Sequence, residues 1–84
     1  MSEQPQNPSE LQVSRNKEPI FRKFVYDKLN KVGYAVLEEL VYSGAELAEI
    51  SPVTAKRYLD KMCSSMGKCV SRTNEFGITL IKYK

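Results

Sequence analysis

One short run, residues 51–62, has side chains suited to binding a polyanion. Ser51 is a good helix N-cap, because its hydroxyl can accept a backbone N–H that a helix start leaves unpaired, and Pro52 suits the first helical position. Apolar residues then recur at i, i+4 and i+7 and predict one buried helix face: Ala55, Leu59 and Met62. The opposite side offers small polar and basic groups: Thr54, Lys56, Arg57 and Lys61. Such a helix suits a DNA major groove, although an ordinary amphipathic surface helix has the same pattern.

The residue types that most catalytic and metal sites need are scarce. The chain has no histidine, which removes most catalytic triads and most zinc sites. Cys63 and Cys69 are too few for a disulfide framework, and we expect both to be partly buried, reduced thiols. No glycine-rich phosphate-binding loop occurs. We therefore expect a protein that is not an enzyme and that has no cofactor and no metal.

Charge is distributed unevenly along the 84 residues. Residues 51–84 hold seven Lys or Arg against two acidic residues, whereas residues 34–50 hold four Glu and no basic residue. Residues 1–33 carry a balance of +2, and the whole chain carries +3. The positive end therefore contains residues 51–62, as expected of a polyanion-binding surface, with a merely solvated basic surface as the alternative.

The length is that of one small domain. Residues 1–16 are polar and include two prolines, so we expect a disordered tail there and a folded domain over residues 17–84. No apolar run approaches the roughly 20 residues needed to span a bilayer, and the N-terminus lacks the features of a signal peptide. We expect a cytoplasmic protein.

The residues before position 51 predict two or three helices. The first begins at Glu18-Pro19, with Pro19 as its first helical residue, and ends at Gly33. Its apolar stripe is broad enough that we consider a homodimer through helix 18–32: Ile20, Phe21, Phe24, Val25, Leu29 and Val32. A second helix is expected over 34–42, with a short extended piece at 34–35 as the alternative. Ser43-Gly44 should break it, and 45–50 should form a separate helical turn.

Two strand-like runs, 68–72 and 78–83, predict a β-hairpin around the connection 73–77. We expect Val70, Ile78 and Leu80 to face the core. Cations would then line the ribbon and its ends: Lys68, Arg72, Lys82 and Lys84.

This element order resembles the winged helix-turn-helix domains of small prokaryotic transcription regulators. The resemblance is carried by Ala45-Glu46-Leu47-Ala48, by residues 51–59 and by the hairpin 68–83. It implies an α+β, mainly α fold, with three to four helices followed by a C-terminal hairpin wing. The usual nine or so residues between the two helices' Ala and Thr are only six here, from Ala48 to Thr54, and the usual glycine is absent. Either the turn is tight and the helix shortened, or this register is off by a turn.

The resemblance implies a DNA-binding transcription regulator that inserts helix 51–62 into the major groove of double-stranded DNA. Arg57 would be the best candidate for a bidentate contact to guanine. Because one such domain reads few base pairs, a specific site would require a dimer on two half-sites. The alternative is a protein–protein interaction module without nucleic-acid binding. The residues that would contact DNA are Ser51, Pro52, Val53, Thr54, Lys56, Arg57, Tyr58, Lys61, Lys68, Arg72 and Asn74.

Overall fold

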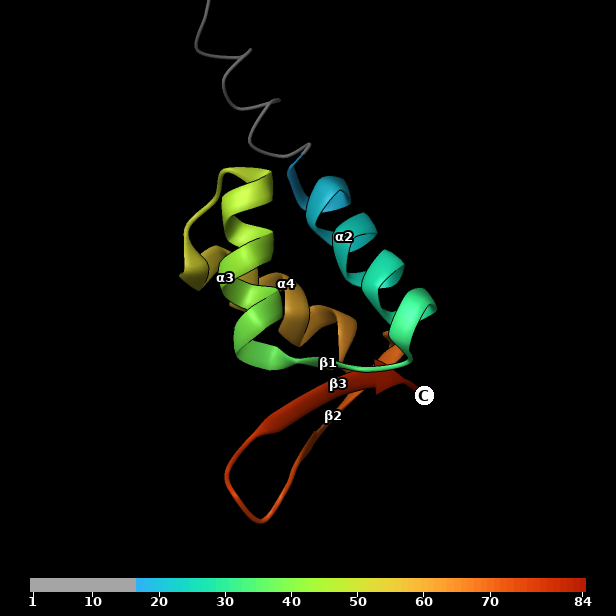
Figure 1. Cartoon of the computed structure of the whole chain (residues 1–84). Coiled ribbons are helices and arrows are strands. Elements are labelled where there is room, and N and C mark those ends of the chain that lie inside the picture. Colours follow the sequence, from blue (N-terminus) through green and yellow to red (C-terminus); the bar gives the residue numbers. More distant parts are fainter. Residues whose placement is uncertain (1–16) are drawn as a thin grey trace, which may run out of the picture.

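A computed structural model describes residues 17–84, and the tail predicted over 1–16 lies outside the described residues (Figure 1). Six elements follow one another along the chain. They are α2 (Lys17–Val32), β1 (Ala35–Val36), α3 (Leu37–Ala48), α4 (Pro52–Met62), β2 (Cys69–Thr73) and β3 (Thr79–Tyr83). In Figure 1 the three helices lie on one side of the strands, and the loop between β2 and β3 extends away from the helices. No helix in residues 17–84 is long and apolar enough to cross a membrane.

The three strands form one antiparallel sheet in the order β1-β3-β2. The central strand is β3. Its Ile81 pairs with Ala35 of β1 on one side and with Ser71 of β2 on the other. A short first strand, added to a C-terminal hairpin that follows the helices, is consistent with a winged-helix layout. The predicted fold class, mainly helical α+β with a C-terminal hairpin, is confirmed.

A single core joins all three helices to the sheet. In α2 the predicted apolar stripe is only partly buried. Phe21, Val25 and Leu29, which are four residues apart, face inward. Ile20 and Val32 are about half exposed. The three predicted core positions of α4 are confirmed as buried. The largest fully buried side chains are Phe21, Val25, Leu29, Leu40, Leu59, Met62, Cys69 and Ile81.

The predicted break at Ser43-Gly44 is wrong, because α3 runs without interruption from Leu37 to Ala48. The separate helical turn expected over 45–50 is the last turn of this helix and the residues that follow it. Gly44 lies against α2, where an added Cβ would be 2.4 Å from a ring carbon of the buried Phe21. The glycine therefore permits a close approach of two helices, and the packing this allows offsets its poor helix propensity.

The turn between α3 and α4 is tight, as one of the two alternatives has it, but α3 is not shortened, since it runs over 12 residues. Glu49 adopts the left-handed conformation, with φ 58° and ψ 48°, at the position where a glycine is usual. The backbone N–H of Ile50 then donates to the carbonyl of Ala45 at 2.9 Å. Only Glu49, Ile50 and Ser51 separate the two helices.

Two helix boundaries of α2 can be compared with the sequence prediction. The helix begins at Lys17, so Pro19 is its third residue rather than its first. Proline is tolerated there because the first-turn N–H groups have no partner within the helix. The predicted end is confirmed, since Gly33 has a positive φ of 98° and its N–H donates to the carbonyl of Leu29 at 2.8 Å.

The hairpin is present, but its predicted inward residues are wrong by one position. Cys69 and Ile81 are the buried ones, whereas Val70 and Leu80 are half-buried and Ile78 is exposed. Side chains alternate between the two faces of a strand, so a shift of one residue exchanges the whole set. Both faces of this hairpin carry apolar residues, and the periodicity alone therefore could not choose between them.

Candidate nucleic-acid interface

The N-terminus of α4 is capped by Ser51, as predicted. Ser51 has an extended backbone, and its Oγ accepts a hydrogen bond from the N–H of Thr54 at 3.2 Å. The same hydroxyl donates to Oγ1 of Thr54 at 3.0 Å, and Pro52 is the first helical residue. The Ser51 hydroxyl is thus occupied by the cap, while Thr54 retains its own O–H as a donor.

The outer face of α4 is exposed and carries one cation without a carboxylate partner. Val53 is 67% exposed, and Arg57, one helical turn further on, is also exposed. No ion pair of Arg57 occurs within residues 17–84. Lys56, by contrast, lies 3.6 Å from the carboxylate of Asp60. This face can therefore offer a guanidinium and a short apolar side chain to a ligand.

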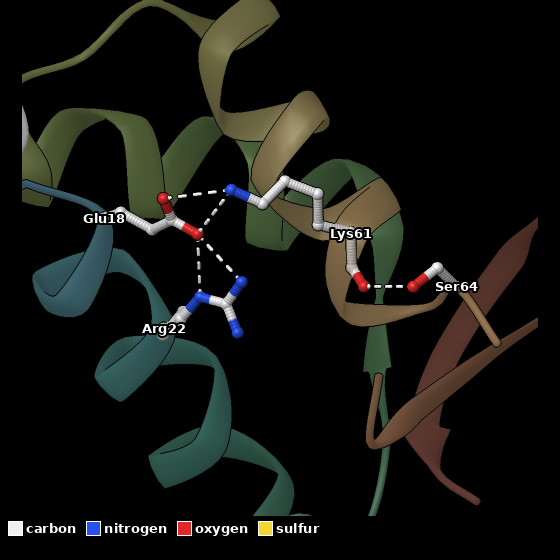
Figure 2. A network of polar contacts seen from close by, with 4 residues as sticks. All are labelled: Glu18, Arg22, Lys61 and Ser64. Atoms are coloured by element: carbon white, nitrogen blue, oxygen red, sulfur yellow. Dashed lines mark hydrogen bonds and ion pairs between the residues drawn. The ribbon is translucent and has the colours of Figure 1, made fainter. Parts of the chain in front are cut away.

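Tyr58 and Lys61 lie on a different side of α4, against α2. The ring of Tyr58 packs on Phe21 at a centroid distance of 5.9 Å, and the Lys61 ammonium is 5.7 Å from the Tyr58 ring centre. Figure 2 shows Lys61 and Arg22 converging on one carboxylate, that of Glu18. Its Oε2 lies 3.0 Å from Lys61 Nζ and 2.8 Å from Arg22 Nη2.

This network joins the start of α2 to the end of α4. Burial by itself raises the pKa of Glu18, but hydrogen bonds from Lys61 and Arg22 outweigh that effect and hold the pKa below its ordinary value. Beyond the network, the hydroxyl of Ser64 donates to the carbonyl of Lys61 at 2.8 Å, which gives a partner to one carbonyl group at the C-terminal end of α4 (Figure 2). Lys61 is therefore engaged in holding two helices together.

The predicted hairpin residues lie away from the outer face of α4. Because Cys69 and Ile81 face the helices, alternation places Arg72 on the opposite face of the sheet. Lys68 precedes β2 and lines a hollow with Tyr26 and Asn30 of α2 and with Tyr83. Asn74 stands in the connecting turn, where its Oδ1 accepts the N–H groups of Phe76 at 2.9 Å and Ile78 at 3.0 Å. The eleven predicted residues are thus distributed over α4, the hollow beside the end of α2, the far face of the sheet and the turn.

Three hydroxyl residues that the sequence reasoning missed lie beside α4. Ser71, Thr73 and Thr79 line a hollow of about 230 Å³ together with Lys56 and Asp60. The hydroxyls of Thr73 and Thr79 are 2.8 Å apart and hydrogen-bonded. In the sequence these three residues alternate with apolar and basic residues along the two strands. This alternation could identify them only after the inward face of the hairpin was known. These hydroxyls are donors and acceptors placed next to the outer face of α4.

The two cysteines are free thiols in the structure. Cys69 is fully buried and Cys63 is half-buried, and burial raises the pKa of each thiol above its ordinary value. A raised pKa leaves little thiolate at neutral pH, so both are poor nucleophiles. Among residues 17–84, no three His, Cys, Asp or Glu side chains gather as metal ligands.

Comparisons with known protein families, with curated proteins and with solved structures give no match for this chain. The geometry of α4 and the hairpin is therefore the basis for any proposal about function.

Proposed function

We propose that this protein binds double-stranded DNA and acts as a transcription regulator, with α4 entering the major groove. The observation that supports this most is the outer face of α4. It is exposed, begins with a capped helix start and carries Arg57 without an intramolecular carboxylate partner in the described part of the chain. A helix of this kind can approach base edges without first breaking an ion pair.

In this proposal each part of the surface has a different role. Arg57 contacts base edges, with a bidentate contact to guanine as its best geometry, and Val53 contacts the groove floor or a thymine methyl. Ser71, Thr73 and Thr79 contact phosphates from the hairpin side of the hollow. Lys56 contributes only where a phosphate displaces Asp60, since the two are paired.

The test is binding of the full chain to a random duplex pool and then to a selected duplex, measured against salt for wild type and Arg57→Ala. We expect Arg57→Ala to weaken binding to the selected site by about 1–3 kcal/mol and to relax the preference at one base pair. Lys23→Ala, which removes an exposed cation of α2, is the matched control and should bind like wild type. No binding at low salt, or equal affinity of Arg57→Ala and wild type, would contradict the proposal.

A homodimer is part of this proposal, because a single domain of this size reads few base pairs. The surface we propose for it is the exposed remainder of the α2 stripe, Ile20 and Val32, next to the half-buried Phe24. Selected sites with two half-sites at fixed spacing would support a dimer on DNA. Selected sites with one half-site only would exclude it.

A specific observation favours a second candidate, a protein-interaction module without nucleic-acid binding. Two of the three cations of α4 are already paired with carboxylates, Lys56 with Asp60 and Lys61 with Glu18. Such pairing reduces the charge that α4 can offer to phosphates. Failure of wild type to bind any duplex at low salt would favour this candidate over the first.

A further inference from the structure

The turn between β2 and β3 presents an exposed aromatic ring. Phe76 is 78% exposed, and the turn that carries it extends away from the helices (Figure 1). Aromatic side chains are enriched at the centres of protein interfaces, because one ring buries a large apolar area. Phe76 is therefore placed where a partner could bury it.

The turn holds this ring in place through its own hydrogen bonds. The Oδ1 atom of Asn74 accepts the backbone N–H groups of Phe76 at 2.9 Å and of Ile78 at 3.0 Å. The N–H of Asn74 in turn donates to the carbonyl of Ile78 at 2.9 Å. Gly77 has a φ of 82°, which glycine adopts without strain. A partner that binds Phe76 therefore has little backbone freedom to remove.

The residue before Phe76 carries a negative charge. Glu75 is the only acidic residue among positions 68–84, and it forms no ion pair within residues 17–84. A free carboxylate at this tip repels a phosphate backbone, so the turn suits a protein surface better than DNA. The matching surface has an apolar hollow with a cation beside it.

The chain has such a surface on α2. A hollow of about 220 Å³ is lined by Phe24, Asp27, Lys28, Lys31 and Val32. Its apolar part is formed by Phe24, which is half-buried, and by Val32, which is 50% exposed. A protein cavity of about 150 Å³ accommodates benzene, so this hollow is large enough for one phenyl ring.

One of the charged residues around this hollow is available to a carboxylate. Asp27 and Lys28 are both engaged in ion pairs of their own chain, at 3.0 and 3.5 Å. Lys31 is exposed and forms no ion pair within residues 17–84. Glu75 and Lys31 are thus complementary charges, each next to an apolar group that is exposed to water.

We infer that Phe76 of one copy of this chain enters the α2 hollow of a second copy, with Glu75 beside Lys31. The tip cannot enter the hollow of its own chain, because the turn extends away from the helices (Figure 1). The inference rests on the homodimer of the proposed function and adds what covers its α2 surface. It leaves the outer face of α4 free, so Arg57→Ala should associate like wild type.

The test is sedimentation velocity of the full chain without DNA at about 0.1 M salt, where charges interact over about 10 Å. We expect wild type to associate as its concentration rises towards about 1 mM. Phe76→Ala should associate at least about tenfold more weakly. Met66→Ala, which removes an apolar side chain that is 93% exposed elsewhere on the surface, is the matched control and should associate like wild type.

Exchanging the two charges tests the pairing of the tip with the hollow. Glu75→Lys and Lys31→Glu should each associate several-fold more weakly, because each brings like charges together. Glu75→Lys/Lys31→Glu should recover the association of wild type. Glu75→Lys/Lys82→Glu has the same net charge but leaves two cations facing each other, so it should stay as weak as Glu75→Lys. Circular dichroism checks that each variant is folded.

Wild type that stays monomeric up to about 1 mM would overturn the inference. Phe76→Ala that associates like wild type would overturn it too, and would leave the α2 hollow to residues 1–16 or to another protein. Because association is measured without DNA, a chain that dimerises in this way but binds no duplex would contradict the proposed DNA binding alone.

Discussion

Gly44 is the position where a one-carbon change should have the most informative effect on stability. Replacing it by Ala adds a Cβ that would lie 2.4 and 2.7 Å from two ring carbons of Phe21 and 3.2 Å from a ring carbon of Phe24. Real Cβ contacts essentially never fall below 3.0 Å, so α2 and α3 must separate or the Phe21 ring must move. Phe21 is fully buried, and the ring therefore has little room to do so.

Two opposing contributions set the size of the effect. Ala is a better helix former than Gly by about 0.8–1.0 kcal/mol, which favours the variant. Overpacking of a buried ring costs about 1–3 kcal/mol, which opposes it. We expect a net loss of about 1 kcal/mol in the free energy of unfolding, which corresponds to a fall in Tm of about 4–8 °C for a domain of this size.

The assay is urea unfolding followed by circular dichroism, with a second mutation to locate the cause. In a Phe21→Leu background the ring edge is absent, and Gly44→Ala should become neutral or stabilising. The coupling between the two positions should fall in the range of about 0.5–3 kcal/mol seen for residues in contact. Ser43→Ala, at the exposed neighbouring position of α3, is the control and should change stability by only a few tenths of a kcal/mol. A Gly44→Ala protein as stable as wild type or more stable would refute the close-packing explanation of this glycine.

Three further predictions concern the helix cap, the ion network and the thiols. Ser51→Ala should lower the free energy of unfolding by about 1 kcal/mol in thermal or urea unfolding, while Ser51→Asp should retain most of it, because only the latter keeps an acceptor for the N–H of Thr54. Glu18→Gln should lower the free energy of unfolding at neutral pH, because the pKa of Glu18 is lowered in the folded state. The difference in stability between variant and wild type should persist above the ordinary glutamate pKa of about 4.3 and vanish as pH falls through the lowered pKa. A difference that does not change between neutral and acidic pH would contradict this. In native protein at pH 7, iodoacetamide should modify Cys63 slowly and Cys69 more slowly still, and urea should make the rates equal; fast native modification of Cys69, measured by mass spectrometry, would contradict its burial.

The parts of the fold that were predicted correctly depend on interactions within one turn of chain. Ser51 and Thr54 are three residues apart, so the cap that begins α4 is readable from the sequence. The buried positions of α4 follow from helical periodicity, and Gly33 ends α2 through a conformation that other residues adopt with difficulty. The hairpin was likewise signalled by the composition of its turn.

The incorrect predictions concern positions whose role depends on a partner far away in the chain. From the sequence, Gly44 predicts a break in the helix. Its actual role, to leave room for Phe21 of α2, is visible only in the packed structure. The inward face of the hairpin was assigned one residue out of phase, because both faces carry apolar side chains and only the packed helices distinguish them.

The candidate site shows the same division. By itself the sequence determined a capped, amphipathic helix at 51–62 with a basic side, because capping and periodicity act over a few residues. Only the tertiary structure decided which of its cations are available. Lys61 is paired with Glu18, 43 residues away along the chain, while Arg57 stays on the exposed face of α4. Of the predicted hairpin cations, Arg72 lies on the far face of the sheet and Lys68 lies beside Tyr26 and Asn30 of α2. The physical reason is that ion pairs and the exposure of a side chain depend on which elements pack together. The spacing of residues within one element does not determine that packing.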